Sequence, residues 1–250
     1  MDDSTKLGLN RTGAQMAPIN TSAMQEAADT ALGIDDPSLK ADPMAAAAVR
    51  GQYVTEAGRL GSVPVPGTLT GMLKTGMQKV MGNQPEMLVD KLGERLAFER
   101  SGTRLYEAMI AKVQAMQGTP MAIPVAELIS IREDEARHFK LLEHALVRLG
   151  ADPTAQTPCA DVIGVTSQGV LATVSDPRTT VAQALNALLT AELTDNAGWE
   201  LLIKLAEEHQ QQQMADEFRD ALADEEEHLM KVRAWLESLV LEQGTIAEAS

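Results

Sequence analysis

A chain of 250 residues with a formal net charge of −15 is long enough to bury a sizeable core in one domain. Its 36 acidic side chains outnumber 21 lysines and arginines, which argues against nucleic acid as a partner because basic side chains drive phosphate binding. The single cysteine, Cys159, excludes an internal disulfide framework or a cysteine-rich metal cluster and fits a reducing cytoplasm.

No stretch of the sequence approaches the roughly 20 apolar residues that a membrane-spanning helix needs. The first residues, Met1 to Ser4, are acidic and lack the basic-then-apolar pattern of a secretory signal. We therefore expect a cytoplasmic protein without a membrane partner. Aromatic residues make up only 3% of the chain, while methionine and alanine are abundant, and this composition favours packed helices over sheets. The predicted fold class is all-α.

Residues 1–84 differ in composition from the rest of the chain. They include the run Pro43–Ala48, which ends in four alanines, and a glycine- and proline-rich turn segment at 61–67. Within 69–81, apolar residues recur at helical spacing and predict one short helix. We expect a partly ordered N-terminal arm that wraps the bundle or a neighbouring subunit, with a flexible tail as the alternative.

Four long helices are predicted from residue 85 onward. The first spans about 85–117 and the second about 124–149, each ending before a glycine that can adopt the left-handed conformation. A third helix begins near Thr180, which has capping-box spacing to Gln183, and continues to about 208. The fourth spans about 213–242, and residues 243–250 form a C-terminal tail.

The lengths of the connections predict how these helices are arranged. The links within each helix pair are a few residues long, which forces two antiparallel hairpins. Between the hairpins lies a long crossover, residues 151–178, with a short helix expected around 161–174. A crossover of this length can traverse a four-helix bundle.

A five-residue phrase occurs twice, at Asp134–His138 and at Asp224–His228. In each copy a glutamate precedes the histidine by three residues, so both side chains leave one face of a helix and can hold one metal ion. Upstream of the two copies, Glu99 and Glu192 stand at the same offset from an aromatic residue. A repeated helix pair implies an approximate two-fold axis, and this arrangement predicts a site for two metals.

The core-facing stripe of each predicted helix is apolar at both ends and acidic in the middle. Buried carboxylates are costly unless something neutralises them. Four carboxylates and two neutral imidazoles around two divalent cations sum to zero formal charge, and mixed oxygen and nitrogen ligation suits iron or manganese. The predicted metal ligands are Glu99, Glu135, His138, Glu192, Glu225 and His228.

Two aspartates in the repeated phrases suggest a further layer of support. Asp134 and Asp224 each lie four residues before the local histidine. Across a two-fold bundle, each aspartate can accept the ring N–H of the other copy's histidine and so fix its orientation. Our hypothesis is two crossed pairs, Asp134 with His228 and Asp224 with His138, supported by Arg137. The alternative is that both aspartates are exposed helix acids.

These six candidate ligands resemble those of the ferritin-like di-metal carboxylate superfamily, which includes ferritins, rubrerythrins, manganese catalases and the di-iron subunits of bacterial monooxygenases and desaturases. The resemblance covers about 85–242 and implies a ferritin-like four-helix bundle of two antiparallel hairpins joined by a long crossover. It also implies that Glu135 and Glu225 bridge or clamp both metals. The remaining ligands would terminate one metal each, as the pairs Glu99 with His138 and Glu192 with His228.

Other residues refine this resemblance. Tyr106, seven residues after Glu99, matches a tyrosine that ferritins and rubrerythrins keep beside the metals, although a packed core aromatic is the alternative. Asp195 stands near the place of an extra rubrerythrin acid, but we interpret it as a helix-face acid. A chain with one cysteine has no rubredoxin domain, so an external electron donor protein would supply any electrons. Because ferritin subunits lack an arm like 1–84, we expect a homo-oligomer that is a dimer rather than a cage.

The predicted function is a di-iron redox protein that acts on oxygen or hydrogen peroxide, through Fe(II) oxidation or peroxide reduction at the bundle centre. Manganese and a mixed Mn/Fe pair are alternatives to iron. Two other functions remain open: a di-iron oxygenase acting on an organic substrate, and an iron-binding or storage module with little turnover. We interpret Cys159 as a packed residue rather than a redox thiol.

Overall fold

The computed structural model of the chain describes residues 17–32, 43–65, 85–116 and 123–248, and every regular element in these ranges is an α-helix. The chain divides into two units. One contains α1 (Pro18–Leu32) and α2 (Pro43–Glu56), and the other runs from Leu60 through the remaining helices. No helix in the described ranges is long and apolar enough to span a membrane.

The helices α1 and α2 lie in the segment that we predicted to be an arm, and the sequence analysis did not anticipate them. Each begins at a proline, whose fixed φ suits the first turn of a helix. None of the residues of α2 is buried, so it has no core of its own. The short helix predicted at 69–81 falls outside the described residues.

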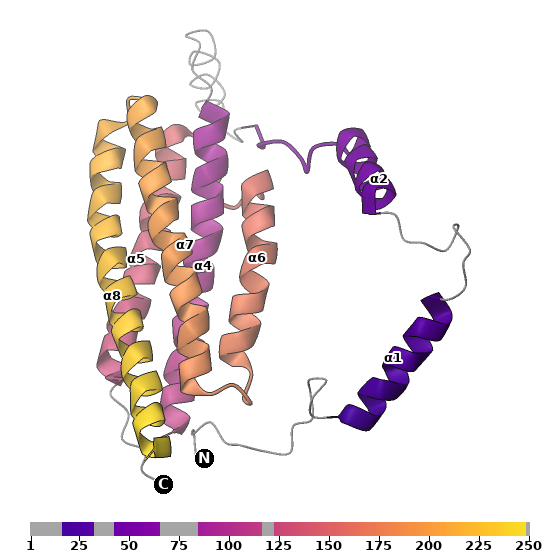
Figure 1. Cartoon of the computed structure of the whole chain (residues 1–250). Coiled ribbons are helices and arrows are strands. Elements are labelled where there is room, and N and C mark those ends of the chain that lie inside the picture. The colour runs from indigo at the N-terminus through magenta and orange to yellow at the C-terminus, as the bar shows by residue number, and fades with distance from the viewer. Residues whose placement is uncertain (1–16, 33–42, 66–84, 117–122, 249–250) are drawn as a thin grey trace. The chain divides into compact units, whose positions relative to one another are not determined.

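Four long helices form the bundle: α4 (Pro85–Ala115), α5 (Val125–Leu149), α7 (Val181–Glu208) and α8 (Gln212–Glu248). As Figure 1 shows, α4 runs beside α5 and α7 beside α8, and the two hairpins meet through α4 with α7 and α5 with α8. The crossover contains α6 (Pro158–Ser175), which packs against α4 and α7. The all-α bundle predicted from the sequence is therefore confirmed.

Local signals explain where several of these helices begin and end. The predicted capping box is present at α7, where Thr180 and Gln183 satisfy each other's backbone N–H groups. Gly150 ends α5 in the left-handed conformation, with φ of 81°. The predicted end of the fourth helix at 242 is wrong, because α8 continues through Gly244 to Glu248. One interior glycine destabilises a helix by only about 1 kcal/mol, so Gly244 does not have to end a helix of this length.

The bundle interior is built from two separate apolar clusters. One lies toward the N-terminal end of α4 and contains Leu88, Leu92, Trp199, Leu202 and Phe218. The other lies toward the opposite end and contains Met109, Leu128, Leu185, Val232 and Trp235. Between them the core-facing positions are polar, as the sequence stripes predicted. The fold thus encloses a polar layer between two hydrophobic ones.

Candidate metal centre

Six polar residues occupy the middle layer, and each is at most 2% exposed to solvent. They come from all four long helices: Glu99 from α4, Glu135 and His138 from α5, Glu192 from α7, and Glu225 and His228 from α8. These are the six residues that the sequence analysis selected as candidate ligands. The structure brings them together because the polar part of each helix's core-facing stripe lies at the same height along the bundle.

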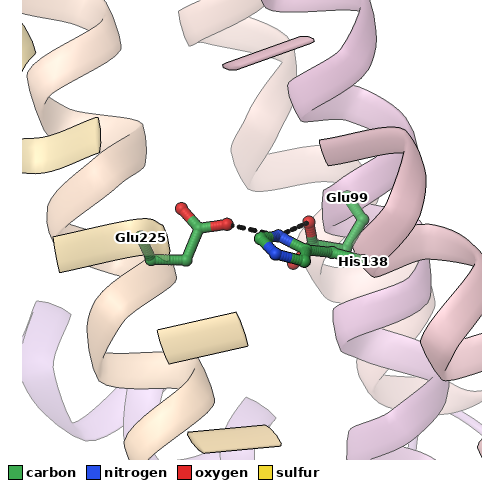
Figure 2. Close-up of side chains that lie close together, drawn as sticks. All are labelled: Glu99, His138 and Glu225. Carbon is green, nitrogen blue, oxygen red and sulfur yellow. Dashed lines mark ion pairs between the residues drawn. The ribbon is translucent and has the colours of Figure 1, made fainter. Parts of the chain in front are cut away.

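Glu225 lies between the two histidines. Its Oε1 is 2.7 Å from Nδ1 of His138, and its Oε2 is 3.2 Å from Nδ1 of His228. On the far side of His138, Oε2 of Glu99 is 3.8 Å from the same ring nitrogen (Figure 2). Glu225 is therefore placed where its carboxylate can be shared by two metal positions, one beside each histidine.

Among the described residues, two groups of three ligands lie close enough to hold one ion each, and so does a carboxylate group of Glu99, Glu135, Asp195 and Glu225. Glu99, His138 and Glu225 form the first group, in which the ligand atoms lie within 4.8 Å of one another. Glu135, Glu225 and His228 form the second group with the same limit. Glu192 stands beside the second group, where its charge acts on His228.

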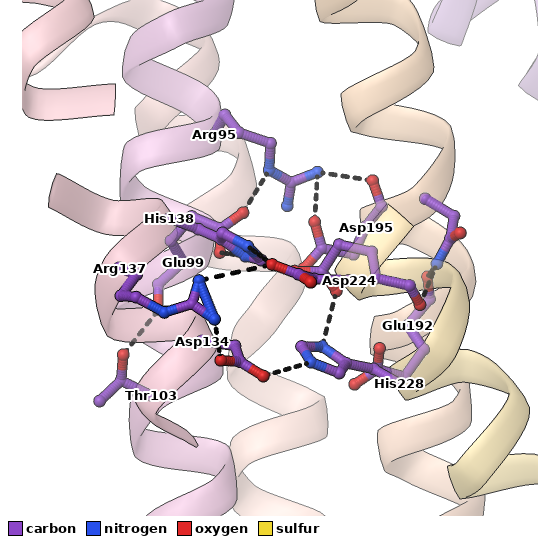
Figure 3. A network of polar contacts seen from close by, with 12 residues as sticks. Arg95, Glu99, Thr103, Asp134, Arg137, His138, Glu192, Asp195, Asp224 and His228 are labelled. Atoms are coloured by element: carbon purple, nitrogen blue, oxygen red, sulfur yellow. Dashed lines mark hydrogen bonds and ion pairs between the residues drawn. The ribbon is translucent and has the colours of Figure 1, made fainter. Parts of the chain in front are cut away.

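Each aspartate of the repeated phrase contacts the histidine of the other copy. Nε2 of His138 is 3.3 Å from Oδ2 of Asp224, and Nε2 of His228 is 3.2 Å from Oδ2 of Asp134 (Figure 3). Arg137 forms ion pairs with both aspartates. Both crossed contacts of the hypothesis are thus present. Because each Nε2 faces an aspartate, Nδ1 is the ring nitrogen that each histidine turns toward the glutamates.

Burial dominates the electrostatics of the layer. It raises the pKa of Glu99, Glu135 and Glu192 well above the ordinary value, and neighbouring carboxylates add to this effect. Burial also acts on Glu225, but the contacts with both histidines outweigh it and lower the pKa of Glu225 to about 2. Burial favours the neutral ring of His228, yet the Glu225 contact outweighs it and raises the pKa of His228 to about 9. When no cations are bound, protons on these glutamates and on His228 therefore neutralise the negative charge of the layer.

Unsatisfied oxygens show that the layer fits metal ions. Six buried carboxylate oxygens make no hydrogen bond within the described part of the chain: both of Glu99 and one each of Glu135, Glu192, Asp195 and Glu225. A buried acceptor without a partner costs about 1–3 kcal/mol, and more when it is charged. Divalent cations would satisfy these oxygens, and oxygen with imidazole ligands suits iron or manganese. The residues present fit a pair of such ions.

Gly102 makes room for one of the candidate ligands. A Cβ at this position would lie 1.9 Å from Oε2 of Glu135, a distance that two non-bonded atoms cannot adopt. Only glycine lets α4 approach that carboxylate so closely. The sequence analysis did not single out Gly102, because a lone glycine within a helix gives no sign of what lies opposite.

The structure adds two charged residues to the site. Arg95, which the sequence analysis did not consider, is 4% exposed, and Asp195 is 2% exposed. The interpretation of Asp195 as a helix-face acid is wrong, because it turns inward one helical turn after Glu192 and forms an ion pair with Arg95 of 3.2 Å. Burial raises the pKa of Asp195 to about 7, against the opposing effect of Arg95. As a pair the two are formally neutral, so four glutamates still balance two divalent cations.

Two aromatic residues border the layer. The hydroxyl of Tyr106 donates a hydrogen bond to Oε1 of Glu192, and the ring is 1% exposed. Trp199, at the equivalent place in the repeat, packs edge-on against His138 with ring centroids 5.6 Å apart. Tyr106 therefore has a polar contact with a candidate ligand, whereas Trp199 supports a histidine by packing.

Cys159 lies outside the layer, in the first turn of α6. Burial and its contact with Asp90 raise the pKa of the thiol to about 11, so the thiol is protonated at neutral pH. A protonated thiol is a poor nucleophile, which agrees with the interpretation of Cys159 as a packed residue.

A four-helix bundle whose centre holds four glutamates and two histidines defines the ferritin-like class of proteins. Comparison with known families agrees: residues 90–241 match the ferritin-like domain, and the chain belongs to this family. The match includes all six candidate ligands. Comparisons with curated proteins and with solved structures gave no match.

Proposed function

We propose that the protein binds two iron ions at the centre of the bundle and oxidises Fe(II) with oxygen or hydrogen peroxide, with manganese or a mixed Mn/Fe pair as alternatives. One observation carries the proposal. Four glutamates and two histidines from four helices share one buried layer, and several of their oxygens have no hydrogen-bond partner among the residues that the structure describes. Such a layer is costly to build unless cations bind there.

The chain's own residues prepare the layer for this chemistry. The two apolar clusters exclude water from either side, which strengthens electrostatic interactions between them. The crossed aspartates orient the two imidazole rings and leave Nδ1 free to bind. When bound, a pair of redox-active cations supplies electrons for cleavage of an O–O bond. Tyr106 holds an O–H group beside Glu192, where it can deliver a proton or an electron.

Metal stoichiometry is the first test. Protein loaded anaerobically with Fe(II) and separated from free metal should retain two ions per chain. The double variant Glu135→Gln/Glu225→Gln should retain none, because it removes both glutamates of the repeated phrase. Glu226→Gln, which neutralises an exposed acid next to Glu225, is the matched control and should keep two. Loss of binding in the control, or full binding in the double variant, would contradict the proposed site.

Oxidation kinetics distinguish the two oxidants. Oxidation of two Fe(II) ions releases two electrons, which with two protons reduce one hydrogen peroxide to two waters. Fe(II)-loaded protein mixed with peroxide under anaerobic conditions, or with oxygen alone, should show a fast absorbance increase that free Fe(II) lacks. A faster reaction with peroxide assigns a peroxidase-like role, and a faster reaction with oxygen assigns a ferroxidase role. No acceleration with either oxidant would leave iron binding with little turnover as the function.

Repeated turnover requires a source of electrons. The single cysteine leaves the chain without a rubredoxin-type donor of its own, and we propose that a separate protein supplies electrons. A dithionite-reduced small electron carrier should then re-reduce the oxidised protein and sustain peroxide consumption.

Native mass analysis of the same sample tests the expected dimer against a large shell.

A further inference from the structure

The two halves of the candidate centre come from duplicated helix pairs, yet their surroundings differ. The offset that relates Glu99 to Glu192 also relates Arg95 to Leu188. Leu188 is fully buried in one of the apolar clusters. One half of the site therefore has a permanently charged guanidinium where the other half has a hydrocarbon side chain.

Contacts with several residues hold the guanidinium of Arg95 in place. Its Nε is 3.2 Å from Oε1 of Glu99, and its Nη1 is 3.2 Å from Oδ1 of Asp195 and donates to the Asp195 carbonyl. The group lies over the ring of Phe98, 4.1 Å from the centroid. A Cβ on Gly198 would lie 1.9 Å from Nη1, so a glycine on α7 leaves the space that the guanidinium occupies. Figure 3 shows Arg95 between Glu99 and Asp195 at one edge of the polar network.

The two glutamates that are not in the repeated phrases are held differently. Oε1 of Glu99 faces a charged group, Arg95, whereas Oε1 of Glu192 accepts a hydrogen bond from the neutral hydroxyl of Tyr106. Both donors come from α4. In each glutamate Oε2 makes no hydrogen bond within the described residues, so one oxygen of each remains to bind a cation.

A charged neighbour changes how well a carboxylate binds a cation. A guanidinium within hydrogen-bonding distance shares the negative charge of Glu99 and repels a nearby divalent ion, and both effects are strong in a dry interior. Asp195 pairs with the same guanidinium and offsets part of its charge, so the direct contact between Arg95 Nε and Oε1 of Glu99 carries the effect. The Glu192 half has no such cation among its described contacts. Its carboxylate shares its charge only with the neutral hydroxyl of Tyr106 among these donors.

We propose that Arg95 makes the two cation positions unequal: the position held by Glu192 and His228 fills first, and the position held by Glu99 and His138 fills second. This inference rests on the proposed two-metal site. Arg95 acts as a positioning residue, because it binds one oxygen of Glu99 and leaves the other to the metal. The duplicated site then loads stepwise, with a first ion bound at least ~10-fold more tightly than the second, the ratio that about 1.4 kcal/mol produces.

An anaerobic Mn(II) titration of the full-length protein, with free Mn(II) counted by electron paramagnetic resonance, tests this order. Wild-type protein should bind two ions in two resolved steps. His138→Gln should retain only the tight step, and His228→Gln should retain only the weak one. Two equal steps in the wild type would overturn the inference and leave the proposed metal site intact. Failure of the wild type to bind Mn(II), Fe(II) or Co(II) at all would overturn the proposed function as well.

Two variants of the ion pair separate positioning from a merely structural role, because they shift the affinity ratio in opposite directions. Asp195→Asn leaves the guanidinium with Glu99 as its only carboxylate partner and should widen the gap between the steps. Arg95→Leu/Asp195→Asn removes both charges, places at 95 the residue found at the equivalent position 188, and should merge the steps. Arg95→Lys keeps the charge and should keep the gap. A ratio unchanged in both Asp195→Asn and Arg95→Leu/Asp195→Asn would show that Arg95 has no part in setting it.

Discussion

Nε2 of His228 lies 3.2 Å from Oδ2 of Asp134, a residue of the other repeat, 94 positions earlier in the chain. The reciprocal contact joins His138 to Asp224 at 3.3 Å. These contacts tie α5 to α8 at the level of the candidate ligands. In a neutral ring they also select the tautomer, because an Nε2–H that donates to a carboxylate leaves Nδ1 with an electron pair that can bind a metal.

Removing the crossed aspartates should weaken metal binding without removing a ligand. Asp134→Asn/Asp224→Asn replaces each acceptor with an amide that no longer favours the Nε2–H tautomer, and we expect metal affinity to fall about 10–100-fold. Competition with a chromophoric chelator measures this change. Asp220→Asn, an exposed substitution on α8, should leave affinity unaltered. Wild-type affinity in the double variant would show that the aspartates do not support the histidines.

Gly102→Ala tests the close approach of α4 to Glu135. The added methyl group would collide with Oε2 of Glu135 and displace that carboxylate, so the retained metal should drop below two ions per chain. The matched control is Gly164→Ala on α6, where a Cβ meets nothing within 4 Å. The control should keep its metal and gain up to about 1 kcal/mol of stability from better helix propensity. Full metal content in Gly102→Ala would contradict the geometry described for Glu135.

Tyr106→Phe removes a single hydroxyl that contacts Glu192. Both ions should still bind, because every candidate ligand remains, but oxidation of bound Fe(II) should slow by about 100-fold, the lower end of the range that a positioned proton donor contributes. Stopped-flow absorbance after peroxide or oxygen addition gives the rate, and metal analysis gives the stoichiometry. An unchanged oxidation rate would assign Tyr106 to packing alone, the alternative that the sequence left open.

The stability of the metal-free protein should depend on pH in a defined direction. Burial raises the pKa of Glu99, Glu135 and Glu192, and the Glu225 contact raises that of His228 to about 9. A raised pKa gives stability that is complete below the unfolded value and is lost as the pH rises through the folded value. Glu225, with its pKa lowered to about 2, contributes above its ordinary value of 4.5 and loses that contribution only in strong acid.

These shifts predict that the melting temperature of the metal-free protein is highest at about pH 4–5, near the ordinary glutamate pKa, and falls toward pH 9. Bound cations replace the protons, so the benefit of metal should grow over the same interval. Differential scanning calorimetry with chelator or with Mn(II) measures both curves. A metal-free melting temperature that holds constant or rises from pH 6 to pH 9 would contradict the protonation pattern of the layer.

Much of the bundle could be predicted because its signals are local. Apolar spacing gave the helix faces, and helix termini such as Thr180 and Gly150 carry recognisable caps. The six candidate ligands share one phase with the apolar residues around them, so burial followed once the phases were correct. The α8 helix exceeded its predicted end because a single unfavourable residue such as Gly244 costs only about 1 kcal/mol and does not by itself end a long helix.

Residues whose roles depend on a partner from another helix were harder to predict. Arg95 occupies the position one turn before Glu99, but a lone arginine in a helix is usually exposed, and only the space left by Gly198 shows that this one turns inward. Asp195 belongs to the same pair and was interpreted as exposed for the same reason. The helices α1 and α2 have almost no buried face, so no apolar stripe marked them in the sequence.

Anomalous X-ray diffraction from crystals loaded anaerobically with Fe(II) tests the central claim most directly. The account predicts two iron peaks inside the bundle, one beside His138 and one beside His228, with Glu225 close to both. Peaks confined to the acidic surface, or a metal-replete crystal with no iron in the glutamate layer, would contradict it.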